Sequence, residues 1–295
     1  MIINMQKVIY VPPWDSFGGD DNVVLHFGKP VVLGTVSGTS GTDITAISSN
    51  IPGMDGVYLS DIRVEPAQIK ASVNVHGNSR EEMYKNRFEL IRCLTPKATP
   101  GTLYYQNDYI SAKIGAVPEA SPRFVSRIKN YNAAEITFFC PSPFWESLDD
   151  KQVRIAWIGN AFEFPIAIEP KMKFGVIQSK EKVNIETALN TSVIITVSAP
   201  ATDPIKISNN TTGQIIELEH SLSGSEKLII NTKRGAKSVT LVHNDGTGED
   251  AFHYITPDSE LFELVPGENE LEYANWNENE PTRVEIAFCE LHSGV

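Results

Sequence analysis

Between residues 69 and 94 the spacing of apolar residues changes from that of a strand to that of a helix. Over residues 69–75, Ile, Ala, Val and Val alternate with Lys, Ser and Asn, which is the period of a half-buried strand. Ser79 then stands three residues before Glu82, the pattern of a capping box that begins a helix. Pro96 disfavours helical geometry at the residue before it. We therefore predict a strand over 69–75 and a helix from Ser79 to Leu94.

The predicted helix carries apolar residues at helical spacing. Their positions predict a single stripe that packs on the protein core, formed by Met83, Tyr84, Phe88, Leu90, Ile91 and Leu94.

A turn is predicted in the segment Pro52–Leu59, upstream of this strand. Gly53 and Gly56 flank Asp55. Glycine reaches positive φ at little cost, and aspartate can bond its own backbone. This chemistry is typical of a tight turn.

Beyond residue 150 the chain changes to short β-rich runs with turns between them. The polar segment 147–152 shows no periodicity and marks a domain boundary, which predicts domains at 1–150 and 151–295. The spacing of the runs in the second domain is typical of an antiparallel β-sandwich. The predicted strands are 192–197, 205–207, 214–219, 228–231, 238–243, 261–264, 270–273 and 284–288.

The order of turn, strand, single helix and further strands resembles the siphophage distal tail protein family, whose members are baseplate hub components. The resemblance continues in the first domain through Gly101–Tyr105, the hairpin at Asn107–Asp108, and Ala134–Cys140 leading into Pro141–Trp145. In the second domain it includes Asn209–Gln214, Leu228–Thr232, Leu264–Asn269 and the closing Gly294–Val295.

The resemblance implies a mainly β fold with one α-helix. Its N-terminal part would be a ring-forming belt domain, a β-sandwich or split barrel with one helix, and its C-terminal part a galectin-like antiparallel β-sandwich. It also implies a homo-oligomer, a hexameric ring. The partners that it implies are the major tail tube protein, the tail-associated fibre or lysin protein and a receptor-binding protein.

Charge and composition narrow the classes of partner. With 41% apolar and 21% charged residues, the 295-residue chain has an ordinary folded composition. The formal charge of −12 divides into −3 up to Asp150 and −9 from Lys151 onward. An acidic surface gains nothing from phosphate contacts, which argues against nucleic-acid recognition. No apolar run is long enough for a membrane span, and no signal peptide is legible. We expect a protein made in the cytoplasm of the bacterial host and then built into the virion tail.

The search for catalytic or metal-binding patterns gives no candidate. The six histidines show no metal-ligand spacing, and the three cysteines are widely separated. Carboxylate pairs such as Glu217 and Glu219 share a strand face, but no apolar pocket marks either one as a general acid. We expect no cofactor, no metal and no enzymatic activity.

Two sets of residues are candidates for binding. Trp276, Tyr273 and Asn275 place aromatic rings beside an amide, as sugar sites do, so a carbohydrate-binding module that contacts host cell-wall glycans is the alternative function. The second set consists of basic side chains that can meet carboxylates of a neighbouring copy in a ring: Arg80, Lys85, Arg87, Arg123, Arg127 and Lys129.

Overall fold

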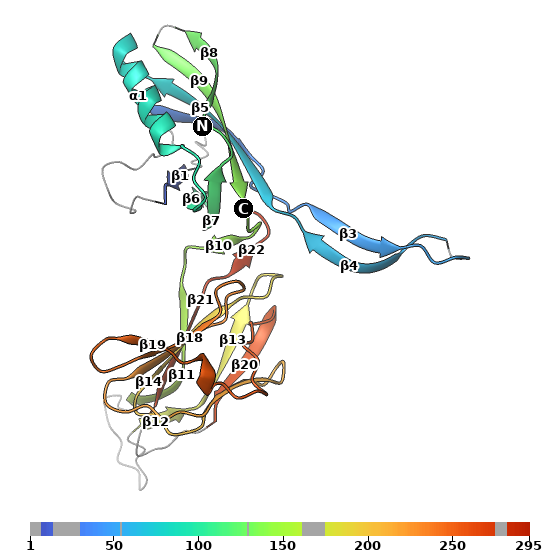
Figure 1. Cartoon of the computed structure of the whole chain (residues 1–295), viewed down its shortest axis with the longest axis vertical. Coiled ribbons are helices and arrows are strands. Elements are labelled where there is room, and N and C mark those ends of the chain that lie inside the picture. The colour runs from blue at the N-terminus through green and yellow to red at the C-terminus, as the bar shows by residue number, and fades with distance from the viewer. Residues whose placement is uncertain (1–6, 14–29, 54, 129, 161–174, 275–281) are drawn as a thin grey trace, which may run out of the picture. The chain divides into compact units, whose positions relative to one another are not determined.

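The computed structural model describes residues 7–13, 30–53, 55–128, 130–160, 175–274 and 282–295. The chain divides into two compact units (Figure 1). The first comprises Met1–Leu148 together with His292–Val295, and the second comprises Asp149–Leu291. The sequence-based boundary after residue 150 differs from this division chiefly in the last four residues. These return to the first unit because β22 (Leu291–His292) pairs with β10 (Trp145–Ser147).

The first unit is built on a nine-stranded sheet. Its central path follows the order β1, β6, β7, β9, β5, β2, and β8, β10 and β22 pair beside it. The bounds are β1 Lys7–Val11, β2 Val31–Ser37, β5 Ala67–His76, β6 Gly101–Gln106, β7 Ser111–Pro118, β8 Arg123–Ile128 and β9 Tyr131–Cys140. The predicted strand over 69–75 is confirmed as the centre of β5. Its four apolar side chains are at most 4% exposed.

Helix α1 (Arg80–Cys93) covers part of this sheet and begins where the sequence predicts. The Ser79 hydroxyl accepts from the Glu82 N–H at 3.1 Å. The Glu82 carboxylate accepts from the Asn78 N–H at 2.8 Å, one residue earlier than in a standard capping box. The first of these interactions satisfies the Glu82 N–H, one of the groups that the first helical turn leaves without an intrahelical partner.

The single apolar stripe predicted for the helix is wrong in part. Met83, Leu90 and Leu94 are buried, whereas Tyr84 is 38% and Phe88 65% exposed. At about 100° per residue, Phe88 lies about 160° around the helix from Leu90. The helix therefore has an inner aliphatic row and an outer aromatic one.

In the core of the first unit, two of the segments that carry the family resemblance pack on each other. The ring of Trp145, which is 2% exposed, packs edge-on against that of Tyr105, with centroids 5.9 Å apart. Phe138 packs on Tyr10 with centroids 5.0 Å apart. The Pro141–Trp145 segment thus closes the core against the strand that begins at Gly101.

The second unit is a sandwich of two antiparallel sheets. The larger has the order β12, β11, β21, β14, β17, β18, β19, with bounds Gly175–Gln178, Lys151–Asn160, Arg283–Phe288, Val193–Ser198, Lys227–Asn231, Ser238–Val242 and Gly248–Asp250. The smaller has the order β13, β20, β15, β16, with bounds Lys180–Ile185, Gly267–Tyr273, Ile205–Asn209 and Gln214–Leu218. A short 3-10 turn, η1, spans Phe252–Tyr254.

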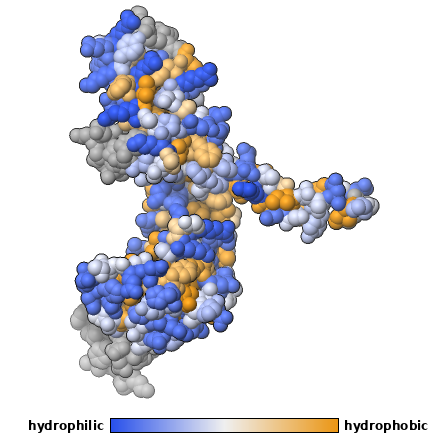
Figure 2. All heavy atoms as spheres, in the orientation of Figure 1, coloured by the Kyte–Doolittle hydropathy of each residue, from blue (hydrophilic) through white to orange (hydrophobic). Residues whose placement is uncertain are grey.

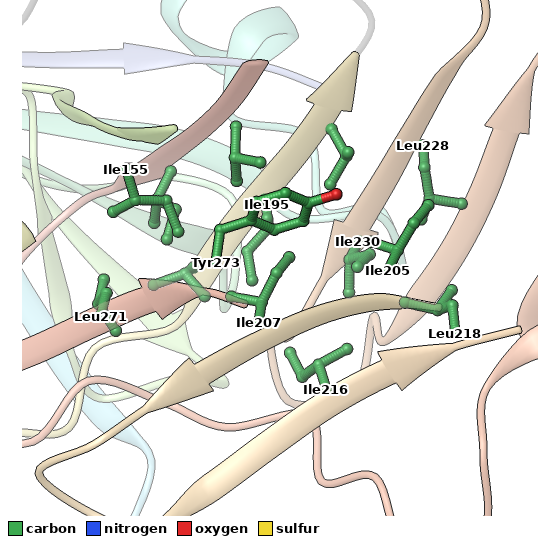
Figure 3. Close-up of a cluster of buried hydrophobic side chains, with 14 of the residues drawn as sticks. Ile155, Ile195, Ile205, Ile207, Ile216, Leu218, Leu228, Ile230, Leu271 and Tyr273 are labelled. Atoms are coloured by element: carbon green, nitrogen blue, oxygen red, sulfur yellow. The ribbon is translucent and has the colours of Figure 1, made fainter. Parts of the chain in front are cut away.

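The inward faces of the two sheets form one core. Ile195 and Ile230 come from the larger sheet, and Ile207, Leu271 and Tyr273 from the smaller (Figure 3); all are fully buried. Alternate residues of each strand point into this core because side chains alternate between the faces of a strand.

Seven of the eight strands predicted in the second unit correspond to observed strands. Residues 261–264 do not form one: Leu264 makes only an isolated bridge with Thr191. The predicted class, mainly β with one α-helix, is confirmed for the part of the chain that the structure describes. Within that part, no helix is long and apolar enough to cross a membrane.

Candidate assembly surface

A two-stranded hairpin extends from the first unit, and nearly all of its residues are exposed. We call residues 43–65 the arm. Its strands are β3 (Ile44–Ser49) and β4 (Tyr58–Val64), which form a separate two-stranded sheet. A bond from the Glu65 N–H to the Asp43 carbonyl, 2.9 Å long, closes its base. Every residue of β3 is exposed, and so is every residue of β4 except the last. Figure 1 shows the hairpin projecting away from the large sheet.

The pairing register gives the arm one apolar face. Ile44 pairs with Val64 and Ala46 with Ile62. A register shift between Ile47 and Ser48 then brings Leu59 to this face. Ile44, Ile62 and Leu59 are 56%, 48% and 50% exposed, and Figure 2 shows apolar residues along the arm.

The other face of the arm is more polar: it carries Thr45, Asp61 and Arg63, together with the apolar residues Ile47 and Tyr58. Burial of the apolar face of such a ribbon would specify its register strongly. Exposed apolar patches of this kind mark interaction sites. The arm is therefore a candidate surface for a contact with another molecule.

Glycines form the tip of the arm, as the predicted turn over Pro52–Leu59 requires. Gly53 and Gly56 have φ of 85° and 90°, a conformation that other residues adopt at a cost. Ile51 and Val57 extend the apolar surface to the tip, where they are 41% and 61% exposed.

The base of the arm is held by the last residues of the chain. The Val295 N–H donates to the Thr39 carbonyl at 2.9 Å. A Cβ on Gly294 would lie 2.9 Å from the Ser40 Cα, so only glycine permits this close approach. Gly38 has φ of 82°, and a Cβ there would lie 2.1 Å from the Gln68 carbonyl oxygen. These contacts fix where the arm leaves the sheet.

The structure places the basic candidate residues on α1 and β8. Arg87 joins the two elements: its guanidinium lies 4.0 Å from the centroid of the Phe124 ring and donates to the Asn132 side chain at 3.4 Å. Arg80 lies 5.9 Å from the centroid of the Tyr84 ring. Lys85 and Arg123 are exposed. The backbone of Arg127 pairs with Asn132 in the sheet, and Lys129 lies outside the described residues.

The sugar-binding candidates are not assembled into a site by the described part of the chain. Tyr273 is 0% exposed and packs in the sandwich core, where its hydroxyl lies 3.5 Å from that of Thr282. Burial raises the pKa of this tyrosine. Tyr273 therefore cannot offer its ring to a sugar, which corrects the expectation. Trp276 and Asn275 lie outside the described residues.

Sequence reasoning found the turn of the arm but missed the arm itself. Apolar residues alternate with polar ones at Ile44 and Ala46 and again at Ile62 and Val64, which is the signal of an amphipathic strand. That signal identifies a face to be buried. It does not reveal that the face stays exposed among the residues that the structure describes.

Family comparisons agree with this architecture. Residues 24–140 match the phage tail protein RIFT-related domain, and residues 186–292 match the C-terminal domain of the siphovirus-type tail component. Together these matches cover most of both units and define a structural component of a phage tail. The chain belongs to the siphophage distal tail protein family. No curated protein sequence matches it.

Solved structures share the fold across the whole chain. The Dit protein of phage SPP1, described as a paradigm of the hub adsorption apparatus in phages that infect Gram-positive bacteria, aligns with a TM-score of 0.69 and 12% identity. That alignment covers 97% of this chain and 99% of the SPP1 chain. A chain of the phage P2 baseplate in its activated conformation with Ca aligns with a TM-score of 0.57 and 14% identity, covering 100% of both chains. At such identities the likeness concerns the fold.

Proposed function

We propose that six copies of this chain close into a ring that forms the hub at the distal end of a phage tail. The ring joins the tail tube to the tail-tip proteins and carries the proteins that adsorb to the host. Membership of the distal tail family supports this role. We infer that the protein acts by assembly and that it makes and breaks no covalent bond.

The single observation that supports self-assembly best is the apolar face of the arm. Ile44, Leu59 and Ile62 each leave about half of their surface exposed. Covering that surface would contribute about 1 kcal/mol per residue. A contact between the arm of one copy and a different surface of the next is heterologous, and such contacts form closed rings when the rotation closes.

The partners that we propose follow from the family. One face of the ring would meet the major tail tube protein, and the other would meet the tail-associated fibre or lysin protein. The second unit would hold a receptor-binding protein. The chain would be made in the cytoplasm of the bacterial host before it enters the tail. Arg80, Lys85 and Arg123 would meet carboxylates of the neighbouring copy, because opposite charges set the register of an interface.

Light scattering coupled to size exclusion tests the ring. We expect the purified chain to have six times the 32.6 kDa mass of one copy and to appear as rings in negative stain. Ile62→Asp places a charge on the apolar face of the arm and should release monomers. The matched control is Thr45→Asp, which places the same charge on the polar face and should leave the ring intact. A chain that is monomeric at tens of micromolar would contradict the proposal.

A further inference from the structure

The outer face of α1 is a second exposed apolar surface of the first unit. We define the helix face as Tyr84 and Phe88, which are one turn apart and 38% and 65% exposed. Aromatic rings in this position are enriched in protein interfaces. The inner row of the helix already packs on the sheet through Met83 and Leu90. The helix face therefore lies outside the core of the first unit and leaves part of Tyr84 and most of Phe88 exposed.

The arm and the helix face differ in charge. Residues 43–65, which form the arm, contain four carboxylates and one arginine, a net charge of −3. Residues 80–93, which form α1, contain four basic and three acidic side chains, a net charge of +1. Lys85 lies next to Tyr84 in the chain and is exposed. An acidic apolar ribbon and a basic aromatic helix are complementary in both charge and polarity.

The arm and α1 are connected to opposite ends of one strand, β5. The arm precedes the first residue of β5, Ala67, and α1 starts four residues after its last, His76. A ten-residue strand is about 30 Å long, and Figure 1 shows the arm and α1 emerging from its two ends. This separation places the two surfaces where one copy can contact a neighbour on each side.

We propose that the apolar face of the arm of one copy docks on the helix face of the next copy. This inference rests on the proposed ring and names the two surfaces that form each of its contacts. Ile44, Leu59 and Ile62 would pack on Tyr84 and Phe88, and the acidic residues of the arm would lie near the basic residues of α1.

Disulfide trapping tests the pairing. Ile62→Cys and Phe88→Cys in the same chain place one thiol on each surface, at exposed positions. Under mild oxidation we expect a ladder of covalent oligomers that ends at the closed ring, because each copy bonds two neighbours. Ile62→Cys alone should give no ladder. The matched control combines Ile62→Cys with Tyr109→Cys, a position that is 97% exposed, and should give at least tenfold less covalent oligomer.

The outcomes separate this proposal from the ring itself. A ring by light scattering without the ladder would overturn the pairing and leave the ring standing. A ladder of equal yield in the Tyr109→Cys control would also overturn the pairing. So would the formation of covalent dimers by Ile62→Cys alone. A monomer under all conditions would overturn both. As a second measurement, Phe88→Ser should raise the concentration at half-assembly at least tenfold while leaving the melting temperature of the monomer unchanged.

Discussion

The buried side chains of Asn209 and Asn269, sixty residues apart, are joined by a hydrogen bond of 3.1 Å from the Asn209 amide to the Asn269 carbonyl oxygen. Both are 0% exposed. Asn269 also accepts from the Val265 N–H at 3.0 Å and donates to the carbonyls of Val265 and Gly267 at 2.7 and 3.1 Å. Two segments that carry the family resemblance, 209–214 and 264–269, thus meet in one polar network.

Asn269→Ala should destabilise the second unit. Removing this side chain leaves the buried Asn209 amide and the backbone of Val265 without their partners, which costs about 2 to 3 kcal/mol. Urea unfolding of the full chain, followed by circular dichroism, measures the loss. Asn210→Ala is the matched control, because Asn210 is exposed and bonds the partly exposed Glu270 and Glu272; it should cost less than about 0.5 kcal/mol. Equal losses in the two variants would contradict a role for burial.

Phe138→Ala should destabilise the first unit by about 3 to 5 kcal/mol. Phe138 is 0% exposed and packs on Tyr10, so its removal leaves a cavity. Phe139 provides the control, since it is the next residue of β9, points to the opposite face and is 38% exposed. Phe139→Ala should cost about 1 kcal/mol or less. Melting temperatures of the two variants test which face of β9 is buried. A larger loss of stability for Phe139→Ala would show that Phe139, and not Phe138, points into the core.

Gly38→Ala should disturb the base of the arm more than Gly41→Ala. Both glycines have φ of 82°, so alanine at either position costs about 1 kcal/mol in backbone conformation. At Gly38 the added Cβ would also meet the Gln68 carbonyl at 2.1 Å, whereas at Gly41 it meets nothing within 4 Å. Hydrogen exchange should therefore become faster at the start of β5 and in the arm in Gly38→Ala alone. Similar exchange in both variants would show that the clash is relieved elsewhere.

His243 should make the stability of the second unit depend on pH. Hydrogen bonds to Glu249 at 2.9 Å and to Glu226 at 3.3 Å raise the pKa of His243 above its ordinary value of 6.5. The pKa of Glu226 is lowered, first by the Ser223 N–H and then by His243. A raised histidine pKa gives stability that is fully present below about pH 6.5 and is lost as pH rises through the folded-state value.

Melting temperatures of wild type and His243→Gln at pH 5.5 and pH 9 test this dependence. The wild type should be the more stable at pH 5.5, and its advantage should shrink at pH 9. The pKa of Asp245 is lowered, first by hydrogen bonds from Thr247 and also by the charge of His243, so Asp245 belongs to the same cluster. His253→Gln is the control, because the His253 ring packs on that of Tyr254, with centroids 4.0 Å apart. An advantage of the same size at both pH values would exclude His243 as its source.

Local patterns in the sequence determined the position of those helices and strands in which buried and exposed residues alternate regularly. The alternation over 69–75 predicted β5, and the Ser79 cap fixed the start of α1, because both signals depend on neighbours within a few residues. The β-rich runs after residue 150 predicted most strands of the sandwich. The family resemblance rested on segments whose residues pack on one another, such as Tyr105 with Trp145.

Only the tertiary structure decided which apolar residues remain outside. Tyr273 and Phe88 are both aromatic residues in periodic segments, yet one is fully buried and the other is 65% exposed. Their exposure depends on what packs over each face, and that contact comes from residues far away in the chain. The arm shows the same limit: its amphipathic pattern is legible in the sequence, but the part of the chain that the structure describes leaves Ile62 48% exposed. The spacing of apolar residues predicts which face of an element can be buried. The tertiary structure decides whether that face packs within the same chain or stays exposed to a partner.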